Sequence, residues 1–327
     1  MRQLGHLFLI TFLLISVSSS SGKAGKGLVQ ATNPAQIPVP KNIIFFISDG
    51  MGFNHLRASN YYVYGKAGQQ VFEQGDWLNL GQATFPAVID IRGSDTIFAA
   101  GYNPRAASMD HRYVKSDYTD SGAAGTALST GVKTYDGAIG LGVLGDTLVN
   151  VTQAAKALGK STGLVSSVYL SHATPAAFAA HNNHRRNYKE IAQYLLFHTR
   201  LDLIMAPGNP DFNDNGNPAR MDAQYIGGRE IWEMLKTNDG RTEFATTDGN
   251  FRVQDTDGDG TANPWTVIQS RDEFLKLASG NTPSRVLGVP KVHQTLQQGR
   301  NASGNEITPF TTPVIETVPT LVEMTRA

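Results

Sequence analysis

The sequence predicts an α/β protein built on a mostly parallel sheet. Residues Asn42–Ser48 form a nearly continuous apolar run, which is typical of a strand buried on both faces. A glycine-rich turn at Asp49–Gly52 and an amphipathic stretch at Phe53–Tyr64 follow, and strand, turn and helix in this order open a parallel α/β unit. A hydrophobic share of 40%, with 33 glycines among 327 residues, is that of a globular protein, so wholesale disorder is excluded.

Helices and apolar strands alternate after this opening unit. We expect helices at Val149–Leu158 and Tyr188–Phe197, a buried strand at Ser161–Tyr169 and a short strand at Asp202–Met205. Such alternation favours a parallel sheet, because parallel strands are joined by helical crossovers. Residues 41–206 are therefore interpreted as the first part of an α/β domain.

The composition changes in the later part of the chain. Asn, Asp, Gly and Thr dominate residues 207–308, which we interpret as a loop-rich insertion outside the main sheet. In residues 309–327 a helix is expected near Pro319, and Glu323 follows Thr320 at the spacing of a capping box. No glycine, asparagine or proline ends this helix, which favours a truncated chain over a frayed terminus.

The N-terminus has the pattern of a secretory signal peptide at residues 1–22. One basic residue precedes an apolar run, and small residues at Ser18–Gly22 suit cleavage. The alternative is a transmembrane anchor, but the run is shorter than the roughly 20 residues that a helical span needs. We expect a secreted or periplasmic protein without a membrane span after signal removal, beginning with a linker at residues 23–40.

Charge and cysteine content exclude several classes of function. The 28 Lys and Arg balance the 28 Asp and Glu, so no nucleic-acid-binding surface is indicated. The absence of cysteine excludes disulfides, thiolate zinc sites, iron–sulfur clusters and cysteine nucleophiles. Any metal must therefore be held by oxygen or imidazole ligands.

Three segments carry residues suited to chemistry. Asp49 follows the first strand, at the sheet edge where ligands bind in open α/β folds. Ser121 opens an Ala/Gly-rich stretch that predicts a tightly packed helix, whose N-terminal N–H groups favour an anion beside a nucleophilic hydroxyl. His172 and Thr174 suit shared coordination of one ion, and Arg185 offers a planar fork for phosphate oxygens. The ordinary alternatives are an Asp turn cap, a helix N-cap and a polar surface loop.

Taken in this order, the three segments resemble the alkaline phosphatase family. The matching motifs are Ile-Ser-Asp49-Gly-Met-Gly, Thr-Asp120-Ser121-Gly-Ala-Ala-Gly-Thr126, Ser-Thr-Gly-Val-Lys-Thr-Tyr135-Asp-Gly-Ala-Ile-Gly140 and His172-Ala-Thr174-Pro-Ala-Ala with Arg185. The resemblance covers residues 41–203 and 319–326, and it departs from the family at Tyr118, where a small aliphatic residue is usual. It implies an alkaline-phosphatase-like sandwich, with helices on both faces of a mostly parallel central sheet, incomplete at its C-terminus.

The resemblance also implies an activity, the hydrolysis of phosphate monoesters. Ser121 matches the nucleophile that becomes a phosphoserine. Arg185, held in part by Asp120, matches the clamp on the non-bridging phosphate oxygens, with Arg186 as the alternative. The family is often dimeric, so a homodimer is expected.

A zinc and magnesium centre is implied in the same way, and this chain holds part of it. Asp49 matches a carboxylate shared by zinc and magnesium, and Thr174 matches a magnesium ligand. His172 stands where family members have Asp or His, and the third metal stays open because histidine is a poor magnesium ligand. The family's remaining ligands lie beyond the helix near Pro319, so we expect a fragment that is nearly inactive alone.

Two Asp-rich loops in the later region suggest calcium. One contains Asp255, Asp257 and Asp259, which alternate as in the first half of an EF-hand-type loop, although Thr266 replaces the final carboxylate. The other has the same alternation and an acidic twelfth position, and its members are Asp211, Asn213, Asn215 and Asp222. The alternative for both loops is an Asx-rich turn.

The sequence is also compatible with two other functions. The first is a related metal-dependent phosphodiesterase or sulfatase, which the serine motif fits less well. The second is a secreted module that binds calcium or phosphate without turnover, a reading favoured by the missing metal ligands.

Overall fold

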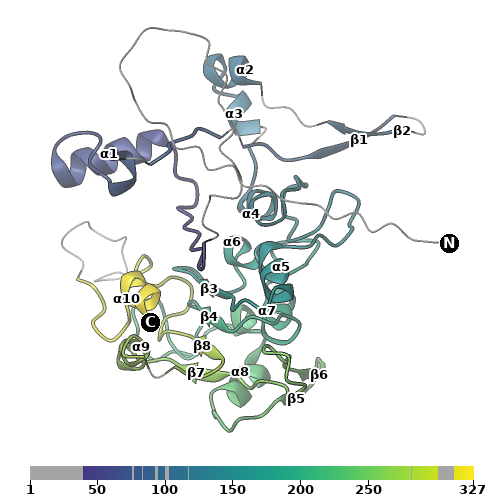
Figure 1. Cartoon of the computed structure of the whole chain (residues 1–327), viewed down its shortest axis with the longest axis vertical. Coiled ribbons are helices and arrows are strands. Elements are labelled where there is room, and N and C mark those ends of the chain that lie inside the picture. Colours follow the sequence, from purple (N-terminus) through teal and green to yellow (C-terminus); the bar gives the residue numbers. More distant parts are fainter. Residues whose placement is uncertain are drawn as a thin grey trace. The chain divides into compact units, whose positions relative to one another are not determined.

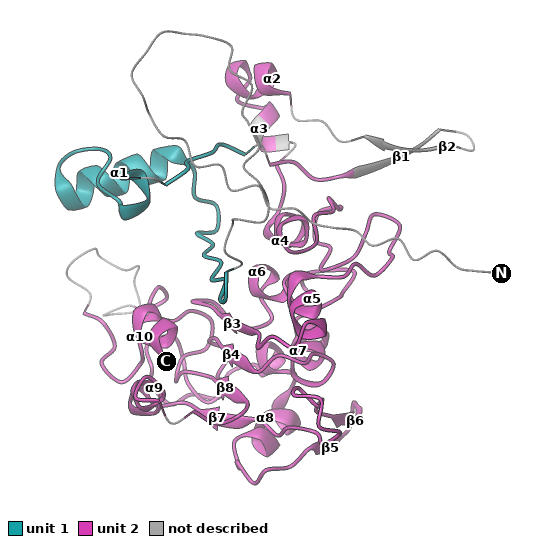
Figure 2. Ribbon diagram, in the orientation of Figure 1, with its two compact units in different colours: residues 1–82 teal, residues 83–327 magenta. Residues whose placement is uncertain are grey.

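The computed structural model describes residues 40–75, 77–82, 84–92, 95–99, 103–116, 118–280, 282–300 and 313–327. The chain divides into two compact units, residues 1–82 and 83–327, which are described separately below (Figure 2). The predicted signal peptide and linker residues 23–39 lie outside the described residues. Among the described residues, no helix combines the length and the apolar character needed to cross a bilayer.

Unit 1 contains the predicted amphipathic helix, α1 (Phe53–Tyr64). It ends at Gly65, whose φ of 69° is a left-handed conformation that glycine adopts without strain. The buried Asn60 links the helix to the short 3₁₀ turn η2 (Val71–Glu73), because its amide nitrogen donates to Glu73 Oε2 at 2.6 Å. This side-chain bond holds η2 against α1.

The predicted buried strand at residues 42–48 is wrong. This segment has no regular secondary structure, and its apolar side chains are exposed, from Ile47 at 38% to Ile43 at 81%. A strand buried on both faces needs neighbouring strands and covering helices. The described residues of unit 1 contain no strand that could pair with it.

Unit 2 is built on a parallel sheet, which confirms the predicted fold class (Figure 1). Its strands are ordered β3 (Gly163–Val165), β4 (Leu203–Met205), β8 (Val286–Gly288) and β7 (Thr266–Ile268). The expectation that residues 207–308 lie outside the main sheet is wrong, because this region supplies both β7 and β8. Strands of three residues are too short to appear in the sequence as long apolar runs.

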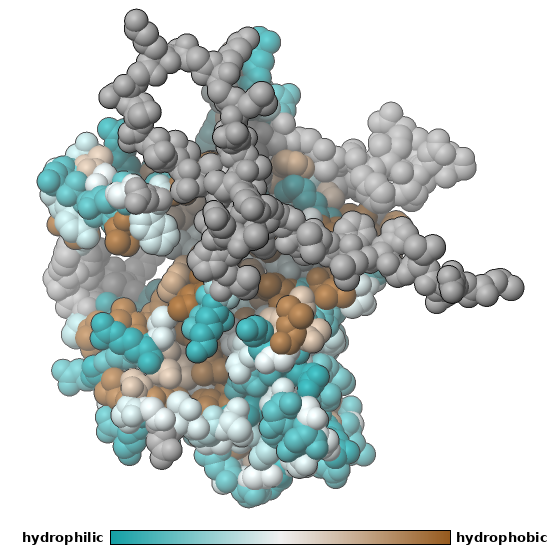
Figure 3. Space-filling view, viewed as in Figure 1, coloured by the Kyte–Doolittle hydropathy of each residue, from teal (hydrophilic) through white to brown (hydrophobic). Residues whose placement is uncertain are grey.

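Strand β3 is shorter and more exposed than predicted. It occupies three residues of the expected Ser161–Tyr169 strand and lies at the edge of the sheet, with Gly163 and Val165 exposed. Figure 3 shows hydrophobic residues among hydrophilic ones on the face of the molecule that it draws. An edge strand buries less than a central one, because it has a neighbour on one side alone.

Alternation along the strands gives the sheet two apolar faces. Leu164, Ile204 and Leu287 share one core with α7 (Tyr188–Phe197) and α8 (Arg229–Leu235). Neighbouring residues of β4, β7 and β8 face the second core, with α9 (Arg271–Leu277) and α10 (Leu321–Arg326); its strand members are Leu203, Met205, Val286 and Ile268. Helices therefore cover both faces of the sheet.

The C-terminal helix begins as the sequence predicts. Thr320 Oγ1 accepts from the Glu323 amide, and Glu323 Oε2 accepts from the Thr320 amide, which is a capping box. Glu323 also pairs with Arg271 of α9. The helix is thereby tied to the sheet through α9.

The remaining elements of unit 2 are peripheral to the sheet. They are β1 (Val88–Arg92), β2 (Asp95–Ala99), α2 (Pro104–Met109), α3 (Tyr113–Ser116), α5 (Val151–Ala157), η3 (Gln224–Ile226), β5 (Glu243–Thr246) and β6 (Gly249–Arg252). Of these, α5 fulfils the helix predicted at Val149–Leu158.

Candidate active site

Ser121 is the first residue of helix α4 (Ser121–Thr130), as predicted. Asp120 is the N-cap, and its Oδ1 accepts from the Ala123 amide at 2.8 Å. The Ser121 side chain is partly exposed at this end of the helix. Its hydroxyl thus lies in the first turn, where the N–H groups and the helix dipole favour a negative charge.

The small residues after Ser121 are needed for close packing of α4 on α6 (Ala173–Ala176). A Cβ on Gly125 would lie 2.9 Å from the Cβ of Ala177, which is closer than two carbon atoms pack. The buried Ser129 hydroxyl donates to the Ala177 carbonyl at 2.6 Å. The Gly-Ala-Ala-Gly sequence therefore sets the distance between α4 and α6.

An ion pair joins the serine helix to the predicted phosphate clamp. Arg185 Nη1 donates to Asp120 Oδ2 at 2.9 Å, and the two side chains are 24% and 16% exposed. Arg186 is exposed, and its amide donates to His184 Nδ1. The structure therefore brings Arg185, rather than Arg186, to the cap of the Ser121 helix.

A segment to which sequence analysis gave no role contacts both partners of this pair. The Gly137 amide donates to Asp120 Oδ1 at 3.0 Å, and the Gly137 carbonyl accepts from the Arg185 amide at 2.7 Å. Asp136 Oδ1 accepts from the Asp120 amide at 3.1 Å. The signal was present in the Tyr135-Asp-Gly-Ala-Ile-Gly140 motif, but nothing in its spacing shows which side chains it meets.

These contacts determine the ionisation of Asp120. Burial raises the pKa of this carboxyl, but the amides of Ala123 and Gly137 and the Arg185 guanidinium together outweigh burial and lower it. Desolvation raises the pKa of Asp136, the Asp120 amide lowers it and the Asp120 charge raises it, with a net increase. At neutral pH Asp120 is therefore a stable anion that holds Arg185 in place.

His172 lies beside the clamp. It is the N-cap of α6, with Nδ1 3.5 Å from the Thr174 amide, and its Nε2 lies 3.4 Å from Arg185 Nη2. The Tyr169 ring packs edge-on against the imidazole, with 5.2 Å between ring centroids. His172 and Thr174 thus lie together at the start of a short helix.

Asp49 lies in unit 1. It is exposed in a turn after the apolar segment, where the Met51 amide donates to the Ser48 carbonyl at 3.1 Å. Its part in a metal site stays a prediction.

The donors near Ser121 fit a metal as members of a larger ligand set. The imidazole of His172 and the hydroxyl of Thr174 suit zinc or magnesium chemistry. In the described part of the chain, however, three His, Asp or Glu side chains converge only at Asp255, Asp257 and Asp259. Further ligands would be needed to complete a centre around Ser121.

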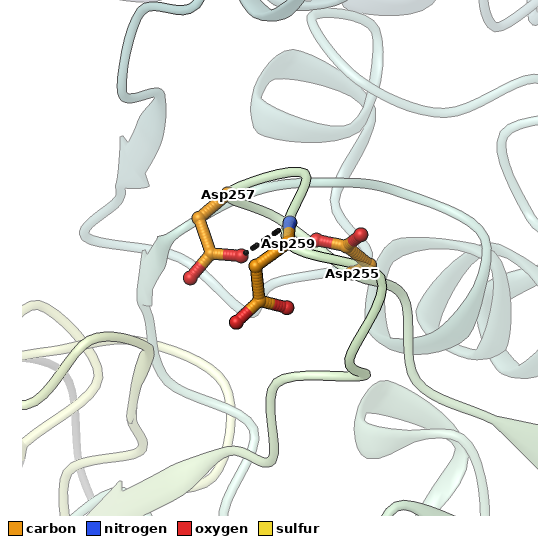
Figure 4. A group of neighbouring side chains, drawn as sticks. All are labelled: Asp255, Asp257 and Asp259. Carbon is orange, nitrogen blue, oxygen red and sulfur yellow. Dashed lines mark hydrogen bonds between the residues drawn. The ribbon is translucent and has the colours of Figure 1, made fainter.

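The Asp255 loop brings its three carboxylates together, as the alternation predicted (Figure 4). One ligand oxygen from each lies within 4.8 Å of the others. Asp255 accepts from the Gly258 and Gly260 amides, and these bonds lower its pKa. The arrangement is also that of an Asx-rich turn, the alternative raised by the sequence.

Two cations, of which Arg285 is buried, hold this loop. Arg285 is fully buried, stacks on Trp265 and donates to the carbonyls of Gln254 and Asn263. Lys156 donates to the Thr256 carbonyl at 2.9 Å. The loop therefore presents its carboxylates from a rigid base.

The other predicted calcium loop uses its carboxylate differently, and calcium binding there stays a prediction. The Asp211 carboxylate pairs with Arg229 and Lys236 and accepts from Trp232 Nε1 at 2.7 Å. Burial raises its pKa, but these three donors together outweigh burial and lower it. Of the other members, Asn213 Oδ1 accepts from the Asn215 and Asn217 amides, and Asp222 Oδ1 accepts from the Gln224 amide. Two cations already pair with Asp211, so a calcium ion would have to compete with them for this carboxylate.

Comparison with known proteins supports the resemblance. The family model for alkaline phosphatase matches residues 40–327. The chain belongs to the alkaline phosphatase family. It is 32% identical over 294 residues to the alkaline phosphatase of Escherichia coli K12, covering 87% of this chain and 55% of that protein. It is 34% identical over 188 residues to alkaline phosphatase 4 of Bacillus subtilis 168, covering 53% of this chain and 34% of that protein.

The chain thus spans between a third and just over half of these two relatives. Among solved structures, the cold-active alkaline phosphatase of a Shewanella species matches with 22% identity and a TM-score of 0.43, covering 78% of this chain and 47% of that one.

Proposed function

We propose that this chain carries the nucleophile and the phosphate clamp of a metal-dependent phosphomonoesterase. The observation that supports the proposal is the Asp120–Arg185 ion pair at the start of the helix that Ser121 opens. A cation, a helix N-terminus and a serine hydroxyl at one place suit a phosphate dianion and its displacement.

The chemistry follows from these groups. A guanidinium has five N–H donors, more than the contacts of Arg185 with Asp120 and His172 require, so others can hold non-bridging phosphate oxygens. The Ser121 oxygen loses its proton and bonds to phosphorus, and the alcohol leaves with its oxygen protonated. Water then attacks the phosphoserine, releases inorganic phosphate and returns the proton to Ser121.

Asp49, His172 and Thr174 would hold part of a zinc and magnesium centre. Such ions lower the pKa of a hydroxyl or a water and stabilise charge on the leaving oxygen. Phosphoryl transfer depends mainly on positioning and charge stabilisation, so an incomplete ligand set should be costly.

Zinc-dependent hydrolysis of a chromogenic phosphate monoester tests the proposal. We expect no turnover from this chain alone, and turnover from a longer form that supplies the remaining ligands. Ser121→Ala should remove that turnover, and a phosphoserine should be found at Ser121 in the unsubstituted enzyme. Turnover that survives Ser121→Ala would contradict the proposed nucleophile. We also propose that residues 1–22 direct export of the protein and that the protein forms a homodimer.

Calcium binding at the Asp255 loop is a second candidate function. The converging carboxylates support it, since calcium prefers several oxygen ligands. A calcium titration should raise the unfolding temperature of this chain, and Asp257→Asn combined with Asp259→Asn should remove the shift. Both side chains are exposed, so the variant should fold. An equal shift in the unsubstituted chain and in the double variant would exclude calcium binding at this loop.

A further inference from the structure

The segment Tyr135–Gly140 joins the two halves of the phosphate clamp. The Gly137 amide donates to Asp120 Oδ1, and the Gly137 carbonyl accepts from the Arg185 amide. The segment is therefore the direct backbone link between the serine helix and the loop that carries Arg185.

Both ends of the segment are anchored. The Gly140 amide donates to the buried Thr126 hydroxyl of α4 at 2.9 Å. Ile139 and Asn182 exchange two backbone hydrogen bonds, of 2.9 and 2.8 Å. The Tyr135 hydroxyl donates to the Asn183 carbonyl at 3.2 Å. A displacement of this segment would move α4 and the Arg185 loop relative to each other.

Asp136 is the side chain of this segment that reaches back to the site. It is exposed, and Oδ1 accepts from the Asp120 amide, the peptide group immediately before the nucleophile's cap. Its negative charge lies near that of Asp120, where it would repel a phosphate. An aspartate at this place is therefore unfavourable for phosphate binding unless its hydrogen bond has a use.

We propose that Asp136 is a positioning residue, which fixes the Asp120 peptide so that Asp120 holds Arg185 at the phosphate. The proposal rests on the proposed function of Arg185 as the phosphate clamp. Asp136 itself would not touch the substrate. It would act through the hydrogen bond to the Asp120 amide.

Two substitutions separate the hydrogen bond from the charge. Asp136→Asn and Asp136→Ala both remove the charge, but Asn retains an oxygen that can accept from the Asp120 amide. The affinity for inorganic phosphate, measured by phosphorus NMR titration of the whole chain, should be about three- to tenfold weaker in Asp136→Ala than in Asp136→Asn. The phosphate affinity of Asp136→Asn should equal or exceed that of the unsubstituted protein.

A second measurement reports on the hydrogen bond itself. Amide exchange at Asp120 should be faster in Asp136→Ala than in Asp136→Asn, while the unfolding temperatures of the two variants stay close because the side chain is exposed. A role in general stability alone would shift the unfolding temperature and leave the phosphate affinity of the folded protein unchanged.

Arg185→Ala distinguishes the two levels of the proposal. If it abolishes phosphate binding while Asp136→Ala and Asp136→Asn bind equally, Arg185 is the clamp and the positioning role of Asp136 is overturned. If phosphate binding is absent from the unsubstituted protein or unaffected by Arg185→Ala, the proposed function fails and the role of Asp136 falls with it.

Discussion

At the scale of single residues, Asp120 shows that an ordinary and a functional interpretation can both hold. Its Oδ1 caps the serine helix and accepts from Gly137, whereas its Oδ2 pairs with Arg185. The sequence offered a helix N-cap as the alternative to a catalytic motif. One carboxylate has enough acceptor sites to serve as the cap and to hold the clamp.

The pH dependence of stability should report on Asp120. Its pKa in the folded protein lies below the reference value of 3.8, so its stabilising effect is fully present above that pH and is lost as the pH falls through the folded value. Urea unfolding should show the unsubstituted protein to be more stable than Asp120→Asn at pH 7. The difference should vanish in strong acid, and a difference that grows on acidification would contradict this account.

At the scale of elements, close packing between helices decides where the site residues lie. Helix α4 approaches α6 through Gly125, and the α6 segment carries His172 at its start. The loop after α6 then returns Arg185 to the Asp120 cap. Side-chain size at one helix contact therefore controls the distance between the nucleophile and the clamp.

Gly125→Ala should destabilise the protein despite the better helix propensity of alanine. Overpacking against Ala177 costs about 1–3 kcal/mol, against a gain of about 1 kcal/mol from replacing glycine. Adding Ala177→Gly removes the clashing methyl, so the double variant should be more stable than the sum of the two single effects by about 1 kcal/mol. Strict additivity in urea unfolding would show that the helices do not meet as described.

At the scale of the whole molecule, the region 207–308 is part of the main fold of unit 2. Its strands β7 and β8 extend the sheet, and Arg285 beside β8 donates to the Leu201 and Thr199 carbonyls as well as to the Asp255 loop. Burial lowers the pKa of Arg285 to about 9, which still leaves it charged at neutral pH. One buried cation thus joins the sheet, the end of α7 and the loop.

Arg285→Met should be among the most destabilising single substitutions in the chain. It leaves several buried carbonyl groups without a donor, each at a cost of about 1–3 kcal/mol, so the free energy of unfolding should fall by about 3 kcal/mol or more. Arg241, which pairs with Asp239 at the surface, is the matched control, and Arg241→Met should have a much smaller effect. Similar losses for both arginines in urea unfolding would contradict the structural role of Arg285.

Local pattern in the sequence was enough to predict several helices and the type of sheet. Periodicity placed α1 and α7, and strand-helix alternation indicated a parallel sheet. The Asp-Ser pair and the Thr320–Glu323 spacing placed the starts of α4 and α10. Motif order also identified the family, because the residue types around Ser121 and His172 are specified by chemistry as well as by fold.

Contacts between residues distant in the sequence depend on the tertiary structure. The run at residues 42–48 has the composition of a buried strand, but burial depends on partners that local sequence does not contain. The short strands β7 and β8 join the sheet because β8 pairs with β4 and with β7, and because α9 and α10 pack on one face. Their apolar runs are too brief to be recognised in the sequence. Asp211 and Asp255 lie in similar motifs, but two cations from α8 and its end reach one carboxylate while the other loop keeps three carboxylates together. Asp136 was missed for the same reason, since its hydrogen bond to Asp120 spans 16 residues and depends on how the chain returns to the serine helix.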